Sequence, residues 1–137
     1  MKNEGALIPS KTRDRYWIDA ENPSAIWSDN SGKWLLFIPS TRVDHIWKII
    51  RVETEAGRLG SGAKVATDEQ NPLATSRRTK LICVYTYNSE DLEDVRRVRQ
   101  RLRDLGFSKK LPYKTDAATT AGKYTKRGDK KVSMLYE

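Results

Sequence analysis

Apolar and polar positions along the chain form two successive blocks, each with a strand pattern followed by a helix pattern. In the first block, residues 34–38 are five consecutive apolar residues between the turn residues 30–33 and Pro39, which predicts a buried strand. The helix pattern that follows repeats apolar residues at the spacing of one helical face, at Val43, Ile46, Trp47 and Ile50. This unit is the one around which the rest of the chain is expected to fold.

The second block consists of a strand-like run at residues 80–87 and a helix that ends at Gly106. The apolar face of this helix comprises Leu92, Val95, Val98, Leu102 and Leu105. Side chains that can accept free backbone N–H groups predict where helices begin. They are Ser40 or Thr41 for the first helix and Asn88 or Ser89 for the second. The basic residues 96–103 of the second helix are expected to lie in solvent.

Shorter strands are predicted at residues 15–19 and 63–67, with a surface loop at residues 68–79. Together these patterns predict an α+β domain, an antiparallel or mixed sheet with helices packed on one face. The 137 residues are expected to form a single domain, residues 1–137, of which residues 1–12 are a flexible arm. The residues predicted to share one contiguous core are Trp34, Phe37, Trp47, Ile50, Ile82, Val84, Leu102 and Leu105.

The composition limits the partners, the location and the metal sites that the protein can be expected to have. The chain has 26 Lys and Arg against 18 Asp and Glu, a net charge of +8, which attracts phosphates, nucleic acids or anionic surfaces. It contains no apolar run of membrane-spanning length and no secretory signal pattern, so a cytoplasmic protein without membrane contact is expected. With Cys83 as the single cysteine and His45 as the single histidine, no metal site with recognisable ligand spacing can be built. Cys83 is expected to be a small buried side chain.

Two features outside the predicted core are candidates for binding. Trp27 lies in a polar loop, where a large ring needs either the edge of the core or a flat ligand as its partner. Residues 114–131 contain six basic and two acidic residues interleaved with small hydroxyl residues and glycines. Such a segment suits a phosphate, because backbone N–H groups, hydroxyls and cations can converge without crowding. The alternative for this segment is a solvated loop leading into a final edge strand.

The order of these motifs resembles that of the eukaryotic mRNA-cap-binding translation initiation factor 4E, in which a loop tryptophan precedes a Gly-Lys-Trp strand. Here Trp27-Ser28-Asp29 is followed by Gly32-Lys33-Trp34, and Trp47 lies in the next helix. The chain is still more similar to the BLES-type proteins, an uncharacterised family with the same fold, in which some members carry a provisional phosphothreonine lyase domain label. The matching stretches are residues 32–37, 59–67, 82–86, 94–106, 113–116 and 122–124. The resemblance implies a 4E-like curved antiparallel sheet with helices packed on one face.

In the cap-binding factor, the loop tryptophan stacks on the methylated base, a neighbouring glutamate reads the base edge, a second tryptophan closes the sandwich and basic residues hold the phosphates. Trp27 matches the first tryptophan, but Ser28 stands in place of the glutamate, with Asp29 directly after it. Trp17 is the candidate for the second tryptophan, and Asp68 stands where the factor has a phosphate-binding arginine. These departures argue against true cap binding, because a paired base edge contributes strongly to discrimination.

The leading hypothesis is therefore a non-catalytic, monomeric module without a cofactor. It would bind a nucleotide, an RNA end or another phosphorylated ligand by tryptophan stacking and a basic phosphate-binding loop. The expected ligand-binding residues are Trp27, Asp29, Lys64, Lys114, Thr119, Lys123, Tyr124, Lys126 and Arg127.

Two alternatives of other classes remain open. The first is a lyase that eliminates phosphate from a phosphorylated side chain, as the family label suggests, with Lys64 or Lys114 as the base and His45 as the acid. A histidine early in an amphipathic helix is more often a surface or capping residue. The second alternative is a scaffold that binds a protein partner through the helix face opposite the sheet.

Overall fold

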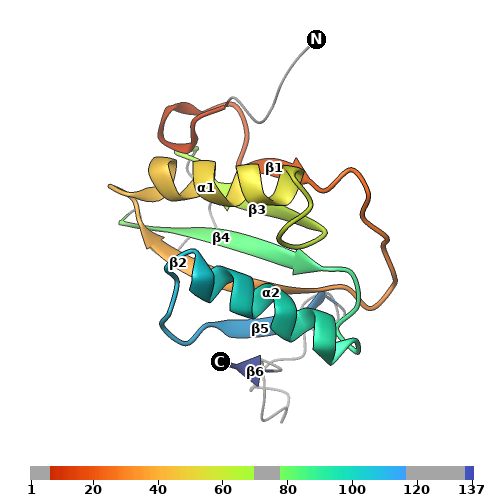
Figure 1. Ribbon diagram of the computed structural model, residues 1–137. Coiled ribbons are helices and arrows are strands. Elements are labelled where there is room, and N and C mark those ends of the chain that lie inside the picture. Colours follow the sequence, from red (N-terminus) through yellow and green to blue (C-terminus); the bar gives the residue numbers. More distant parts are fainter. Residues whose placement is uncertain (1–6, 70–77, 117–134) are drawn as a thin grey trace, which may run out of the picture.

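The described part of the chain is built around a six-stranded antiparallel sheet (Figure 1). The computed structural model describes residues 7–69, 78–116 and 135–137. The elements in chain order are the 3-10 helix η2 (Pro9–Lys11), β1 (Trp17–Glu21), β2 (Gly32–Pro39), α1 (Val43–Glu55), β3 (Gly62–Ala66), β4 (Thr79–Thr86), α2 (Leu92–Asp104), β5 (Pro112–Thr115) and β6 (Leu135–Tyr136). In space the strands follow the order β1-β3-β4-β2-β5-β6. The α+β class predicted from the alternating blocks is confirmed.

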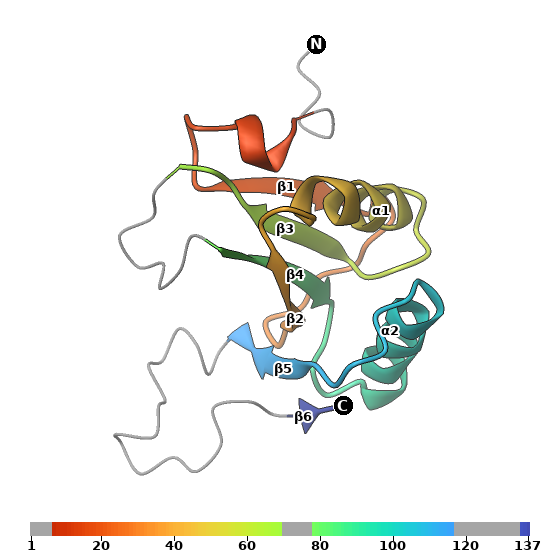
Figure 2. The same ribbon diagram turned by 90° about the vertical axis from the view of Figure 1, so that its left-hand side faces the viewer.

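Both α-helices cover the same face of the sheet and leave the other face without a helix (Figure 2). We call these two surfaces the covered face and the open face. Helices α1 and α2 span 13 residues each, and no helix in the described residues is long and apolar enough to cross a bilayer. The short β6 forms one edge of the sheet, the place that the alternative for residues 114–131 gave to a final strand.

One contiguous core fills the space between the covered face and the helices. Six of the eight predicted core residues belong to it: Trp34, Trp47, Ile50, Ile82, Val84 and Leu102. The prediction was wrong for Phe37, which is 58% exposed, because side chains alternate along β2 and its neighbours Leu36 and Ile38 take the covered face. Leu105 is only partly buried, because α2 has ended before it.

Both helices begin later than the sequence predicted. Helix α1 starts at Val43 after Arg42, whose side chain makes no capping bond, so neither Ser40 nor Thr41 caps it. Helix α2 is capped by Asp91, whose carboxylate accepts the backbone N–H of Asp94. The expected caps of α2 are used in the preceding turn. The side chain of Asn88 accepts the N–H of Glu90, and the backbone N–H of Ser89 donates to the carbonyl of Asn30.

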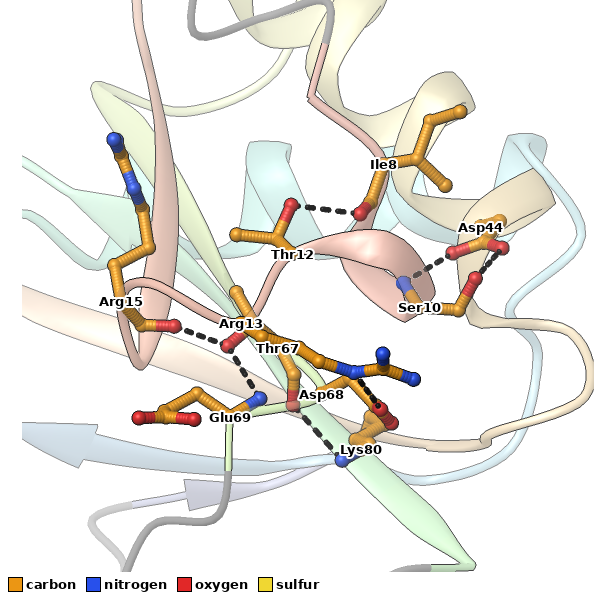
Figure 3. A network of polar contacts seen from close by, with 10 residues as sticks. All are labelled: Ile8, Ser10, Thr12, Arg13, Arg15, Asp44, Thr67, Asp68, Glu69 and Lys80. Atoms are coloured by element: carbon orange, nitrogen blue, oxygen red, sulfur yellow. Dashed lines mark hydrogen bonds and ion pairs between the residues drawn. The ribbon is translucent and has the colours of Figure 1, made fainter.

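The amino-terminal part of the described chain packs against α1 and the end of β3 (Figure 3). The backbone N–H and the hydroxyl of Ser10 donate to the Asp44 carboxylate at 2.9 and 2.5 Å. The Thr12 hydroxyl donates to the carbonyl of Ile8, and the N–H of Asp68 donates to the carbonyls of Pro9 and Thr12. Residues 7–12 of the predicted arm therefore have fixed partners, whereas residues 1–6 lie outside the described residues.

The basic side of α2 is not simply solvated, which corrects the sequence-based expectation. Arg99 is completely buried and donates to the carbonyls of Glu137, Phe107 and Lys109 at 2.7, 2.8 and 2.6 Å. One guanidinium thus satisfies three backbone acceptors that lie between α2, β5 and β6. Periodicity could not reveal this, because a basic residue next to a helical face is normally drawn to water.

A second ionic contact ties the two helices together. Glu53 of α1, whose side chain is 10% exposed, accepts hydrogen bonds from Arg58 and, across to α2, from Arg101. The hydrogen bond from Arg58 is the main cause that lowers the pKa of Glu53 below its ordinary value, with Arg101 acting in the same direction. The ion pairs therefore favour the ionised carboxylate in the folded protein.

This geometry predicts an acid-sensitive component of stability. A carboxyl group whose pKa is lower in the folded than in the unfolded state stabilises fully above its unfolded pKa, about 4.3 for Glu, and loses that effect as the pH falls. We expect Glu53→Gln to cost about 1 kcal/mol at pH 7, since both arginines are partly exposed, and almost nothing at pH 3. Urea unfolding at a series of pH values measures this difference. The control Glu55→Gln removes a carboxylate from the more exposed pair with Arg51 and should cost less than about 0.5 kcal/mol at pH 7. A pH-independent cost of Glu53→Gln would contradict the assignment.

Candidate ligand-binding face

The open face carries three lysines from three different strands. Because side chains alternate along a strand, the buried Trp34, Val65 and Tyr113 place their neighbours on the opposite side. Lys33 of β2, Lys64 of β3 and Lys114 of β5 consequently share the open face. The register pairs Lys33 with Lys114 on one side and with Tyr85 on the other. The sheet thus brings Lys64 and Lys114, both predicted from sequence, to one surface.

Trp27 is held at the end of this surface by the loop between β1 and β2. The hydroxyl of Ser28 donates to the carbonyl of Tyr87 at 2.6 Å and accepts the N–H of Asn30. The carbonyl of Asn30 in turn accepts the N–H of Ser89 at 2.6 Å. Ser28 therefore anchors the loop to the end of β4, a role different from that of the base-reading glutamate at this place in the cap-binding factor.

The indole of Trp27 packs against the open face and stays accessible. Its ring centroid lies 6.4 Å from that of Tyr85, with the rings edge to face, and the Trp27 side chain is 53% exposed. The Trp27 ring lies beside Gly62, where a Cβ atom would meet it at 3.5 Å, an ordinary van der Waals distance. Trp27 is therefore supported along one edge and leaves aromatic surface for a ligand. Asp29, the other predicted residue of this loop, is exposed.

The lysines of the open face differ in the contacts that they already make within the protein. The Lys33 ammonium donates to the Asp116 carboxylate at 2.5 Å, and Asp116 also accepts the hydroxyl of Ser31 at 2.5 Å. Lys64 lies over the ring of Trp17, 4.1 Å from its centroid. Trp17 is thus on the open face, as its role of second tryptophan would require, but it contacts a lysine. In the register Lys64 also faces Asp19 of β1. Among the described residues, the positive charge most available to an anion therefore comes from Lys114.

Cys83 lies beneath these side chains, and its thiol is unreactive. It is 1% exposed, and burial raises the pKa of its thiol to about 11, against the opposing influence of Lys64 and Lys33. Such a thiol is protonated at neutral pH and is neither a nucleophile nor a metal ligand. The described residues contain no group of three or more His, Cys, Asp or Glu side chains that could hold a metal ion.

The candidates for lyase chemistry are separated by the sheet. His45 lies in the first turn of α1, where its side chain is exposed, and α1 packs on the covered face. Lys64 and Lys114 are on the open face. The structure therefore does not bring the proposed acid next to either proposed base.

Five of the predicted binding residues lie outside the described residues: Thr119, Lys123, Tyr124, Lys126 and Arg127. A shared site between Trp27 and this basic segment stays a prediction. Asp68, which departs from the phosphate-binding arginine of the cap-binding factor, pairs with Arg13 at 3.1 Å (Figure 3).

The sequence analysis missed Lys33 and Tyr85 as members of this surface. Lys33 belongs to the residues 30–33 that the pattern assigns to a turn, and Tyr85 belongs to the run 80–87, whose β-forming residues predict a strand without showing which face each side chain takes. A usable signal was present, since Lys33 precedes the buried Trp34 and therefore had to point away from the core. Asp116 was missed because nothing local indicates its pairing with Lys33.

A comparison with protein families found a match. The model of the family described as basophilic leukemia-expressed protein Bles03 matches residues 28–122, more than half of the chain. The matched part contains the three open-face lysines and Tyr85. It begins directly after Trp27, so the match does not extend to the residue whose ring is most exposed on this surface.

Proposed function

Since the chain belongs to the Bles03 family, whose model matches β2, β3, β4 and β5 of the sheet, we propose that the open face binds a nucleotide, free or at the end of an RNA chain. The observation that carries the proposal is the half-exposed Trp27 ring, supported by Tyr85 at the margin of a surface with three lysines. A nucleotide combines a flat ring with phosphate, so it matches both parts of the surface.

The register suggests how such a ligand would lie. Trp27 packs over Gly62, and Lys64 follows on the same face two residues farther along β3, a distance of about 7 Å along a strand. A base stacked on Trp27 would therefore place its phosphates toward Lys64. Lys114 lies three strands away from β3, about 14 Å at the usual strand spacing, and suits a more distant phosphate. Lys33 would contribute less, because Asp116 already neutralises it.

We expect Trp27→Ala to weaken nucleotide binding by about 1 to 3 kcal/mol, because stacking of one base on one aromatic side chain contributes that much. The measurement is a titration with ATP, with GTP and with a short 5′-phosphorylated RNA, followed by calorimetry. Trp27→Phe is the matched control and should retain most of the affinity. Equal affinities of Trp27→Ala and the unaltered protein for all three probes would overturn the stacking role.

The contribution of the lysines to phosphate binding is tested separately, by the dependence of the affinity on salt concentration. Lys64→Gln and Lys114→Gln should each lower the affinity and flatten its dependence on salt, since fewer counterions are released on binding. Arg103→Gln removes the same charge from α2 on the other side of the sheet and should leave both quantities unchanged. A result in which all three variants behave alike would show that only the overall charge attracts the ligand.

An assay for turnover separates this function from the lyase alternative. A phosphothreonine peptide incubated with the protein should release no phosphate. Release that disappears in His45→Ala would replace the binding function by the lyase function.

We also infer that the sheet is a version of the initiation factor 4E fold. The inference is supported by the single covered face, by one helix after β2 and one after β4, and by the loop tryptophan before β2. Superposition of an experimental structure of this protein on the initiation factor would test it. A different strand order in the two sheets would reject it.

A further inference from the structure

A second concave surface lies between η2 and α1, on the helix side of the sheet and away from the open face. It is a hollow of about 450 Å³. This volume falls within the range of sites for small molecules, about 300 to 1,000 Å³. Its apolar wall consists of Leu7, Ile8, Pro9 and Trp47, and its polar lining of Lys11, Asp44, His45, Lys48 and Arg51. No residue of this hollow belongs to the open face.

The hollow is shaped by contacts within the protein. The carboxylate of Asp44 accepts both the N–H and the hydroxyl of Ser10, which fixes η2 against the first turn of α1 (Figure 3). The Thr12 hydroxyl closes η2 by donating to the carbonyl of Ile8 at 2.8 Å. The walls are therefore preformed, and a ligand would not have to order them.

The charge of the lining is predominantly positive. Lys11, His45 and Lys48 are exposed on its rim. Arg51 forms an ion pair with Glu55, with 3.1 Å between Nη1 and Oε1. The single acid of the lining, Asp44, is already engaged by Ser10. An anion at this rim would meet cations and no free carboxylate.

Trp47 supplies an independent observation. Its side chain is 1% exposed, and its indole Nε1 is buried with no hydrogen-bond partner among the described residues. Buried donors are almost always paired, so the unpaired N–H distinguishes Trp47 from the rest of the lining. Because Nε1 is buried, an oxygen in the hollow can reach it only if the wall shifts.

We propose that this hollow binds a small organic anion with an apolar body, such as an aromatic monocarboxylate. The apolar body packs against Leu7, Ile8 and Trp47, and the carboxylate lies toward Lys11 and Lys48. This site is independent of nucleotide binding on the open face, because the two surfaces lie on opposite sides of the sheet.

Phenylacetate is a suitable probe, and nuclear magnetic resonance spectroscopy of the full chain is a suitable readout. Titration should shift the indole N–H signal of Trp47, assigned with Trp47→Phe, together with the amide signals of residues 7–11. The indole signal of Trp27 should stay in place. Phenylacetamide, which has the same ring without the charge, should bind at least three times more weakly. A Trp47 signal that shows no saturable shift at millimolar phenylacetate would overturn the proposal.

Paired variants distinguish the site from general attraction to a basic protein. Lys11→Gln with Lys48→Gln should lower the affinity for phenylacetate about three- to tenfold, the loss expected for two exposed ionic contacts. The control is the double variant Arg103→Gln, Lys109→Gln, which removes the same charge at and after the end of α2. It should change the affinity for phenylacetate less than twofold. All four side chains are exposed, so the fold is expected to tolerate these changes. Equal losses in the two double variants would overturn the proposal.

Discussion

Replacement of Arg99 by alanine is expected to lower the free energy of unfolding by about 3 to 5 kcal/mol. The guanidinium is fully buried and donates to three backbone carbonyls, those of Glu137, Phe107 and Lys109. The substitution removes one hydrogen-bond donor from each of these carbonyls, of which, among the described residues, only that of Glu137 keeps another, the N–H of Leu111, and it also opens a cavity under α2. Each unsatisfied buried acceptor costs about 1 to 3 kcal/mol, although such costs do not add fully.

Arg99→Lys is expected to recover only part of this loss. The lysine ammonium is a compact point charge, whereas the planar guanidinium reaches three acceptors in fixed directions. Chemical unfolding followed by circular dichroism measures both variants. Arg103→Ala, an exposed position one helical turn later, is the matched control and should change stability by less than about 0.5 kcal/mol. If Arg99→Ala were no more destabilising than this control, the buried guanidinium would not be a structural element.

The second large effect is expected at Gly32, where β2 passes the side chain of Tyr113. A Cβ atom at Gly32 would lie 2.5 Å from Cζ and 2.9 Å from Cε2 of Tyr113, with the hydroxyl oxygen closer still. Tyr113 cannot move aside, because it is fully buried, packs on Trp34 and shares a hydrogen bond with Thr86. Gly32→Ala should therefore destabilise the protein by about 3 kcal/mol, as overpacked cores do.

A double substitution tests whether the contact with Tyr113 is the cause. Tyr113→Leu removes the part of the side chain that the new methyl group would meet, and the methyl group then fills some of the space. The loss in Gly32→Ala with Tyr113→Leu should be smaller than the sum of the two single losses by at least about 1 kcal/mol. Strict additivity of the two losses would assign the cost of Gly32→Ala to another cause, such as the backbone.

This contact also has a consequence for the open face. The strand segment that carries Gly32 continues directly into Lys33, and Ser31 before it donates to Asp116. Close packing of Tyr113 under Gly32 therefore positions the strand beside the Lys33–Asp116 ion pair. The open face depends in this way on a buried residue that no ligand would touch.

Local patterns in the sequence were sufficient for the main elements. The apolar run 34–38 and the helical spacing of Val43, Ile46, Trp47 and Ile50 correspond to β2 and α1, because each element must bury one face to be stable. The exposure of Trp27 outside the core also followed from its polar neighbours. These properties depend on residues that are close in sequence, so the sequence by itself determined them.

Only the tertiary structure decided which polar groups meet. Ser89 does not cap α2, because its backbone is held by the carbonyl of Asn30 in the loop before β2. Arg99 is buried where carbonyls beyond the end of α2 surround it, the farthest that of Glu137, and Lys33 forms an ion pair because Asp116 follows β5 beside β2. The open face is likewise a product of strand order. Its lysines come from positions 33, 64 and 114, and only hydrogen bonding between strands places them on one surface. Partners this far apart in sequence leave no periodic trace along the chain, which is the physical reason that local patterns could not predict them.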